Sequence, residues 1–421
     1  MITRYQQLLL EVLHIDPARP SQSEFSRFSP DDWDAFIGAA IRHRLSCQVS
    51  EYLSSNPGIR EMVPVDGRVR LDRAVRSQLQ HNFSQYQRVR AILTACEKAR
   101  IPILLFKGLW LVDNVYRDPK ARLSGDIDLL IRPEHMPEFT RIARDIGCIV
   151  PDGVTNLQAL APASNEYSLG CRNRETVLDI HWSVTHPISE ARIDEQRIWS
   201  RAENTKVAGV SCLSFRLEDH LLYLCFHAAL HHKFVYVGPR AFLDIAKFIE
   251  SPPRPIDWDD FVDRARELSW ARGVWLTLDL VHEMIGVSPP AFVLEKLRPR
   301  DIPNPDLRGQ FLDAIFLDQS ALLNQSRGNR LSLNIAHLID APWSDKSRIL
   351  FSRLFPPSAE IATHFGVATG SPRLRTYYAK RIISMMQRYG PALLQTLARN
   401  PTRVAEKSRM SKIDSWLGDK R

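Results

Sequence analysis

The chain has 421 residues, of which 44% are hydrophobic and 25% are charged, a composition that is ordinary for a folded globular protein and excludes disorder throughout. This length allows two or three compact units, or one enzyme core with helical additions. The net charge of +8 lies at the C-terminal end: residues 371–421 hold 12 Lys and Arg against 3 Asp and Glu, and the rest of the chain is close to neutral.

The N-terminal region, residues 1–95, is predicted to be helical. Apolar residues recur at every third or fourth position in DDWDAFIGAAIRHRLSCQVSEYLSS and in RVRAILTACEKARI. The opening MITRYQQLLLEVLHID has only a short apolar patch, followed by acidic residues, and indicates an amphipathic helix and no signal peptide. No segment reaches the roughly 18 uncharged residues of a membrane span. We therefore expect no transmembrane segment. The six cysteines are far apart and include no CxxC pair, so we expect reduced thiols and a cytoplasmic protein.

A small α/β core is predicted for residues 96–215, because the pattern changes at Pro102. IPILLF has the continuous apolar character of a buried strand, KGLWLVDNVYRD returns to helical spacing, and DIDLLIR is a second strand. PEHMPEFTRIARDIG is predicted to be a helix that ends at Gly147. EYSLG and TVLDIHWSV then indicate a hairpin or a pair of neighbouring strands.

The remainder of the chain is predicted to be mainly helical. Residues 216–290 form a helical domain that completes a cleft, with helices in EDHLLYLCFHAALHHKF, PRAFLDIAKFIE, IDWDDFVDRARELSW and RGVWLTLDLVHEMIG. Residues 291–421 form a mixed and helical C-terminal region with the basic tail. That tail has two open interpretations, a solvated helical face or a contact with RNA or another anionic surface.

The acidic pair Asp126 and Asp128 gives the clearest chemical signal in the sequence. Side chains alternate along a strand, so both carboxylates point to one side of DIDLLI while the apolar residues between them are buried. Two like charges this close repel, and a hard cation such as Mg²⁺ would neutralise them. Alternation in TVLDIHWSV also places Asp179 and His181 on one face, so we expect Asp179 to supply a third metal-binding carboxylate and His181 to orient the site.

A phosphate-binding turn is predicted at Lys107 and Gly108, where an apolar strand meets a helix. Glycine lets the backbone approach a phosphate, the helix N-terminus presents free N–H groups, and lysine adds a positive charge. Arg122 and Ser124 precede the acidic pair and are expected to donate hydrogen bonds to phosphate oxygens.

Histidines on a later helix are the secondary candidates. His227 and His231 have the four-residue spacing of a zinc pair, but no HExxH pattern is present, so we expect them to line the cleft and not to bind a metal. With His232, Lys233, Arg240 and Asp244 they are predicted to border the nucleotide or its acceptor.

The order of these motifs resembles that of nucleotidyltransferases of the DNA polymerase β-like superfamily. FKGLWL followed by RLSGDIDLL is similar to the Lys-Gly form of abortive-infection toxin nucleotidyltransferases. The wider layout resembles the bacterial "uncharacterised nucleotidyltransferase" family, from its LLFKG start through DIDLLI and LDIHW to the RAFLDIAKFI helix, over roughly residues 30–290. The resemblance implies an α+β fold with a polymerase β-like mixed sheet, two Mg²⁺ ions (with Mn²⁺ as an alternative) and a nucleoside triphosphate substrate such as ATP. It places Lys107, Gly108, Asp126, Asp128 and Asp179 at the matching positions.

One departure concerns the turn, where the superfamily usually has Gly-Ser or Gly-Gly. Here Gly108 is followed by Leu109 and Trp110, so a serine contact to phosphate is absent from the motif.

The expected activity is Mg²⁺-dependent transfer of a nucleoside monophosphate to an acceptor. The sequence does not decide whether this acceptor is a small molecule, a peptide, a protein or RNA. The alternatives are a toxin-type enzyme that modifies tRNA or protein, a biosynthetic enzyme that tailors a peptide or sugar, and a non-catalytic nucleotide-binding scaffold.

Overall fold

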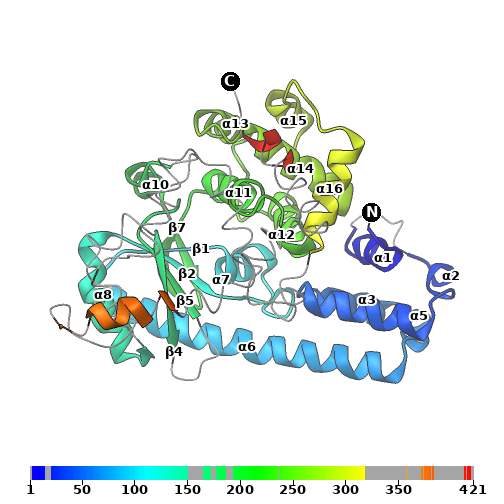
Figure 1. Ribbon diagram of the computed structural model, residues 1–421, viewed down its shortest axis with the longest axis horizontal. Helices are drawn as coiled ribbons and strands as arrows, with labels where there is room; N and C mark the ends of the chain where they lie inside the picture. The colour runs from blue at the N-terminus through cyan, green and yellow to red at the C-terminus, as the bar shows by residue number, and fades with distance from the viewer. Residues whose placement is uncertain are drawn as a thin grey trace.

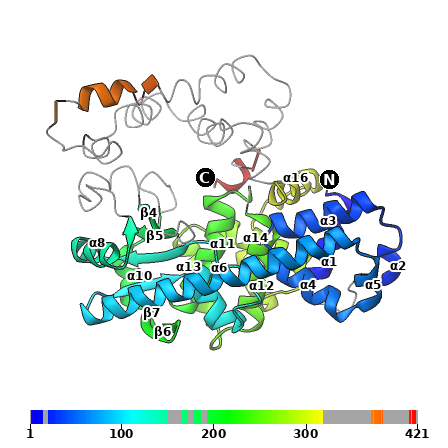
Figure 2. The same cartoon turned by 90° about the horizontal axis from the view of Figure 1, so that it is seen from below.

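The protein has an α+β architecture in which helices surround one seven-stranded mixed sheet (Figures 1 and 2). This computed structural model describes residues 2–14, 20–149, 165–171, 177–185, 193–235 and 237–317, and short pieces between 358 and 418. The predicted fold class is therefore confirmed. Most of the predicted C-terminal region, including most of the basic stretch, lies outside the described residues, so its contacts with RNA or an anionic surface remain predictions.

Among the described residues, six helices precede the sheet, and the last of them is long. The first three begin with capping boxes, as at Ser29, whose side chain accepts a hydrogen bond from the Asp32 backbone while Pro30 occupies the first helical position. The helix α6 runs from this N-terminal group to the sheet along one side of the molecule, where it contacts α3, α4, α8 and β7 (Figure 1). The six are α1 (Arg4–Leu13), α2 (Gln22–Phe25), α3 (Pro30–Arg42), α4 (Ser46–Ser55), α5 (Pro57–Met62) and α6 (Val65–Lys98).

The sheet has the strand order β3-β4-β5-β2-β1-β7-β6. At its centre β1 pairs antiparallel with β2, and the pairs β2–β5 and β1–β7 are parallel. All side chains of β1 and β2 are buried; apart from Asp128 in β2 they are apolar, as the sequence of a buried strand predicts. The strands are β1 (Ile103–Phe106), β2 (Ile127–Ile131), β3 (Cys148–Ile149), β4 (Glu166–Cys171), β5 (Val177–His181), β6 (Glu203–Val207) and β7 (Val210–Ser214).

The hairpin of β6 and β7 was not anticipated from the sequence. Its two-residue loop consists of Ala208 and Gly209, which have φ values of 53° and 77°. Positive φ at both loop residues is the geometry that matches the twist of antiparallel strands, but alanine rarely adopts it, so the sequence carries no Asn-Gly type of signal here. This hairpin extends the sheet beside β1.

The helices that follow the strands carry much of the hydrophobic core. The helix α14 lies at their centre, packs against α1, α11, α12, α13 and α15, and contains ten buried residues. Within the described ranges, no helix combines the length and apolar character needed to cross a membrane, and five cysteines are free. The remaining helical elements are α7 (Gly108–Leu111), the π-helix η1 (Val112–Tyr116), the short η2 (Pro133–His135), α8 (Met136–Asp145), α10 (Glu195–Arg201), α11 (Leu217–Phe226), the π-helix η3 (His227–His231), α12 (Gly238–Glu250), α13 (Trp258–Glu267), α14 (Ala271–Ile285), α15 (Ala291–Leu297) and α16 (Pro305–Ile315).

Candidate active site

Three carboxylates meet where β2 and β5 lie side by side. The parallel register pairs Asp128 directly with Asp179, and Asp126 precedes β2 by one residue. One carboxylate oxygen from each of the three lies within 4.8 Å of the others. Asp128 is buried, Asp179 is half-buried and Asp126 is exposed, so the group is open on one side. The structure thus brings together the three residues that the strand alternation selected.

The proximity of these carboxylates changes their protonation. Burial raises the pKa of Asp179 to about 7, assisted by a hydrogen bond to Asp126 and by the negative charges of Asp126 and Asp128. The Ser168 hydroxyl donates to Asp179 Oδ1 at 2.5 Å and partly opposes this shift. A bound cation would remove the repulsion, and the oxygen-only donor set is the kind that Mg²⁺ prefers.

Asp128 is fixed by two cationic side chains. Lys107 Nζ lies 3.1 Å from Asp128 Oδ1, and His181 Nε2 lies 3.2 Å from the same oxygen. Burial alone would raise the pKa of Asp128, but Lys107 and His181 outweigh it and lower the pKa to about 2. Both contacts are to Oδ1. The second oxygen can therefore face the shared space with Asp126 and Asp179.

His181 connects Asp128 to a further carboxylate. Its Nδ1 lies 2.8 Å from Glu166 Oε2 on β4. Burial opposes protonation of the ring, yet the hydrogen bonds to Asp128 and Glu166 raise its pKa to about 8. A positively charged His181 between two carboxylates holds the orientation of Asp128, in the way that partners of metal ligands do.

The turn at Lys107 is strained and is held by a buried histidine. Lys107 has φ 54° and ψ −132°, a conformation that non-glycine residues rarely adopt. Its backbone N–H donates to His220 Nε2 at 3.1 Å, and its ammonium lies 5.1 Å from the centre of the Tyr223 ring. Burial and the Lys107 charge lower the pKa of His220 to about 3, so the ring is neutral and Nε2 can accept this bond. The turn aims Lys107 at Asp128.

Gly108 lies close to Ser124 and to the backbone of Asp126. A Cβ atom on Gly108 would lie 2.9 Å from the Asp126 carbonyl oxygen and 3.0 Å from Ser124 Oγ, so only glycine fits this close approach. Ser124 is fully buried, and its hydroxyl has no hydrogen-bond partner among the described residues. Such a buried, unpaired hydroxyl is uncommon in folded proteins and is suited to a ligand.

A cavity of about 540 Å³ opens beside Asp126. Helix α6 contributes Gln78 and His81 to its wall, and Arg44, next to α4, also lines it. The wall continues through Ser124 and Gly125 to Asp126. A volume of this size can hold a nucleotide or a small acceptor.

Arg122 was predicted to contact phosphate, and the structure directs its side chain elsewhere. Its Nε and Nη2 donate to the two Asp244 oxygens at 2.7 and 2.8 Å, and Nη1 donates to the carbonyls of Gly108 and Leu123. Arg122 and Asp244 are both buried. Arg240, another predicted nucleotide contact, donates to the Leu123 carbonyl at 2.7 Å. These arginines anchor the segment that leads into Asp126.

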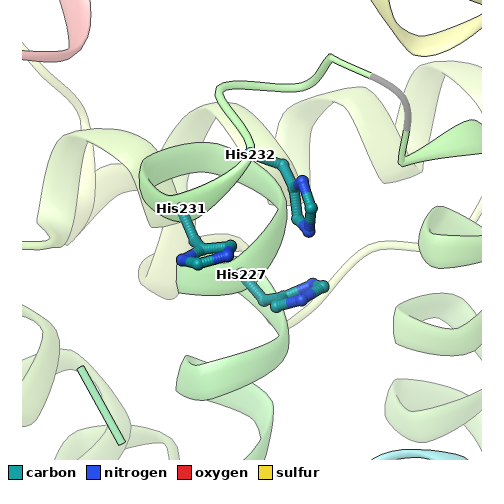
Figure 3. A group of neighbouring side chains, drawn as sticks. All are labelled: His227, His231 and His232. Carbon is teal, nitrogen blue, oxygen red and sulfur yellow. The ribbon is translucent and has the colours of Figure 1, made fainter. Parts of the chain in front are cut away.

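The predicted histidines of the following helix form a cluster with His232 (Figure 3). One ring nitrogen of each of His227, His231 and His232 lies within 4.8 Å of the others. Burial, the Lys107 charge and the neighbouring rings keep the pKa of His227 well below its ordinary value. Burial and His231 lower the pKa of His232 to about 3.

The sequence interpretation did not include Glu166, His220 and Tyr223. Glu166 opens the strand EYSLG, and a register pairing it with His181 would have indicated the contact, but strand register between distant segments is not readable from one sequence. His220 and Tyr223 lie three residues apart in LEDHLLYLCF and therefore share a helix face. The many apolar residues of this helix indicated only a buried helix, so the pair was not recognised as part of a site.

The chain matches a known protein family. A family model described as "Uncharacterised nucleotidyltransferase" matches residues 29–286, which is more than half of the chain and includes the carboxylates, the Lys107 turn and the histidine cluster. No similar protein was found among curated proteins or among solved structures.

Proposed function

The chain belongs to the uncharacterised nucleotidyltransferase family, and from this premise we propose that it transfers a nucleoside monophosphate from a nucleoside triphosphate to an acceptor. The observation that carries the proposal is the meeting of Asp126, Asp128 and Asp179 beside an open cavity. A purely structural acidic cluster has no need for such space.

Magnesium is the proposed cofactor, and the donor set fits it. Burial, a hydrogen bond with Asp126 and the charges of Asp126 and Asp128 raise the pKa of Asp179 to about 7, and a cation would relieve the repulsion among the three carboxylates, which lie within 4.8 Å of one another. When bound, Mg²⁺ would activate the attacking group and neutralise charge on the departing pyrophosphate. Mn²⁺ has the same ligand preferences and is the alternative ion.

The protein's own contribution is positioning. Lys107 and His181 both contact Oδ1 of Asp128 and so fix the orientation of its carboxylate. The other oxygen is then already in position to bind the cation. The unpaired Ser124 hydroxyl offers a hydrogen bond to a phosphate oxygen, in a region where Gly108 lets the backbone come close. This contact compensates for the Leu109 that replaces the usual serine after the glycine.

The acceptor is proposed to enter the cavity that Asp126 borders. Its wall combines the Arg44 cation with amide, imidazole and hydroxyl groups from Gln78, His81 and Ser77. A polar wall of this kind suits a hydroxyl-bearing acceptor, whose attacking oxygen must reach the α-phosphate next to the carboxylates.

The activity is tested with purified protein, Mg²⁺ and each of the four nucleoside triphosphates labelled at the α-phosphate, incubated with separated RNA, protein and small-molecule fractions of a cell extract. We expect transfer of label with release of pyrophosphate. Asp126→Asn and Asp179→Asn should each abolish it with little change in thermal stability. Asp128→Asn should also abolish it but should lower the melting temperature, because Lys107 and His181 would lose the carboxylate that they share. Asp145→Asn, which alters an exposed carboxylate paired with Arg141, is the matched control and should keep full activity.

The fraction that becomes labelled decides among the acceptor classes. Labelled tRNA or protein would identify a toxin-type enzyme, and a labelled peptide, sugar or other metabolite would identify a tailoring enzyme. If no fraction is labelled and calorimetry detects no Mg²⁺-dependent binding of any nucleoside triphosphate, the transferase proposal is wrong. Binding without transfer would favour a non-catalytic nucleotide-binding scaffold.

A further inference from the structure

We propose that His227, His231 and His232 form a second metal site, which binds one Zn²⁺ through three imidazoles and is independent of the carboxylate group. Figure 3 shows the three rings gathered on one side of the helix and turned toward one another. This inference goes beyond the proposed transferase activity, because it concerns a different ion and different ligands.

The backbone explains how three histidines from one short segment converge. His227 and His231 share a helix face because they are four residues apart. In a regular α-helix His232 would point away from them. Here the segment is a π-helix, and the His232 N–H donates to the His227 carbonyl at 3.1 Å, five residues earlier. The wider turn brings position 232 above position 227. Single π-turns of this kind are rare and occur frequently at functional sites.

The chain after the cluster is strained in a way that maintains this arrangement. Lys233 and Phe234 both have positive φ, 53° and 62°, which is uncommon for one such residue and more so for two in succession. Phe234 is fully buried against Phe242 and Phe311, so core packing holds the strained exit from the π-turn. The packing of Phe234 therefore helps to keep His232 near His227 and His231.

The donor set is that of a zinc site with one free position. A tetrahedral ion with bonds of about 2.0–2.1 Å requires nitrogens about 3.4 Å apart, which rotation of rings already within 4.8 Å can supply. His227 and His232 are partly buried and His231 is exposed. Three protein ligands would leave a fourth position for water or a substrate atom.

A simple packing role explains less. Apolar side chains would fill the same space without nitrogen atoms that require partners. Imidazole nitrogen selects Zn²⁺ and related transition metals, while the carboxylates select Mg²⁺, so the two groups would not compete for one ion.

The test is a zinc titration of the untagged full chain by calorimetry, in the presence of excess Mg²⁺ to fill the carboxylate group, followed by dialysis and measurement of metal content. We expect one Zn²⁺ per chain. His231→Ala changes an exposed side chain and should weaken zinc binding by about 100-fold or more, since loss of a partner behind a ligand already costs about 10–100-fold. His227→Gln and His232→Asn keep the size of the side chain and should have the same effect if the fold is retained.

Two further sets of variants distinguish this site from the carboxylate group and from zinc bound loosely at surface histidines. His282→Ala alters an exposed histidine that contacts Ser288 and should leave zinc binding unchanged. Asp126→Asn and Asp179→Asn should abolish transfer but keep the zinc. The proposal is overturned if the wild-type chain binds no Zn²⁺ under these conditions, or if the bound Zn²⁺ persists in the histidine variants. The transferase activity can fail without affecting this outcome, and the zinc result can fail without affecting the transferase.

Discussion

The raised pKa of Asp179 predicts that binding of Mg²⁺ to the carboxylate group depends on pH. Asp179 has a pKa of about 7 in the metal-free protein, because it is buried beside Asp126 and Asp128. A carboxylate must lose its proton to bind a metal, so affinity should rise as pH increases through 7. Protonation of Asp179 raises the apparent Kd for Mg²⁺ about 11-fold at pH 6 and about 1.1-fold at pH 8. The apparent Kd should therefore fall about tenfold between these two pH values.

The same linkage predicts how many protons leave on binding. About 0.9 proton should be released from Asp179 at pH 6 and about 0.1 at pH 8. Calorimetry of Mg²⁺ binding in two buffers with different ionisation enthalpies measures this number directly. Asp179→Asn should remove the release at pH 6, although it also weakens binding. Asp145→Asn should leave both the affinity and the proton count unchanged.

One neighbouring group could imitate this result and needs its own control. His181 has a pKa of about 8, and a cation next to Asp128 would displace its proton mainly between pH 7 and 8. His181→Gln should therefore reduce proton release at the upper end of the range and leave the release at pH 6 intact. A proton count that does not change between pH 6 and pH 8, or a release at pH 6 that survives in Asp179→Asn, would contradict the reasoning.

Three further predictions concern the residues that support the site. Asp244→Ala should lower the free energy of unfolding by about 3–5 kcal/mol in urea titrations, because the Arg122 guanidinium would remain buried without a carboxylate; replacing both residues by apolar ones should restore most of the loss. His181→Gln should weaken Mg²⁺ binding at pH 8 by about 10–100-fold in calorimetry, because it removes the partner that orients its ligand. Gly108→Ala should displace the Asp126 backbone and reduce transfer in the labelling assay, whereas Gly309→Ala, at a helical position with no atom within 4 Å, should raise the melting temperature slightly.

Local patterns were sufficient to predict the centre of the sheet. ILLF is short and continuously apolar, and IDLLI is apolar apart from Asp128; the structure confirms them as β1 and β2. Alternation along TVLDIHWSV placed Asp179 and His181 on one face, which is the arrangement observed. These features follow from the period of a strand, and a single sequence contains that period.

Contacts between segments that are distant in the sequence could not be predicted from such local patterns. The buried ion pair of Arg122 and Asp244 joins residues that are 122 positions apart, and nothing near either residue indicates the other. Sequence position alone suggested that Arg122 donates to phosphate, because it precedes the acidic pair. The structure shows how a residue adjacent to a motif can serve the motif indirectly, by anchoring the segment that carries Asp126.

The two π-turns indicate why helical spacing was the least reliable guide near the cleft. Spacing predicted regular helices through VDNVY and HAALH, and in both segments the chain instead widens into a five-residue turn, η1 and η3. Each turn rotates all following side chains relative to an α-helix, so His232 joins His227 where the α-helical period would separate them. A π-turn is favoured by tertiary contacts such as those of the buried Phe234 and costs local hydrogen-bond geometry. The weakened hydrogen bonds lie within the turn, whereas the contacts that stabilise it come from residues distant in the sequence, so the position of the histidine cluster depends on tertiary packing. The zinc titration tests whether this arrangement binds a metal ion.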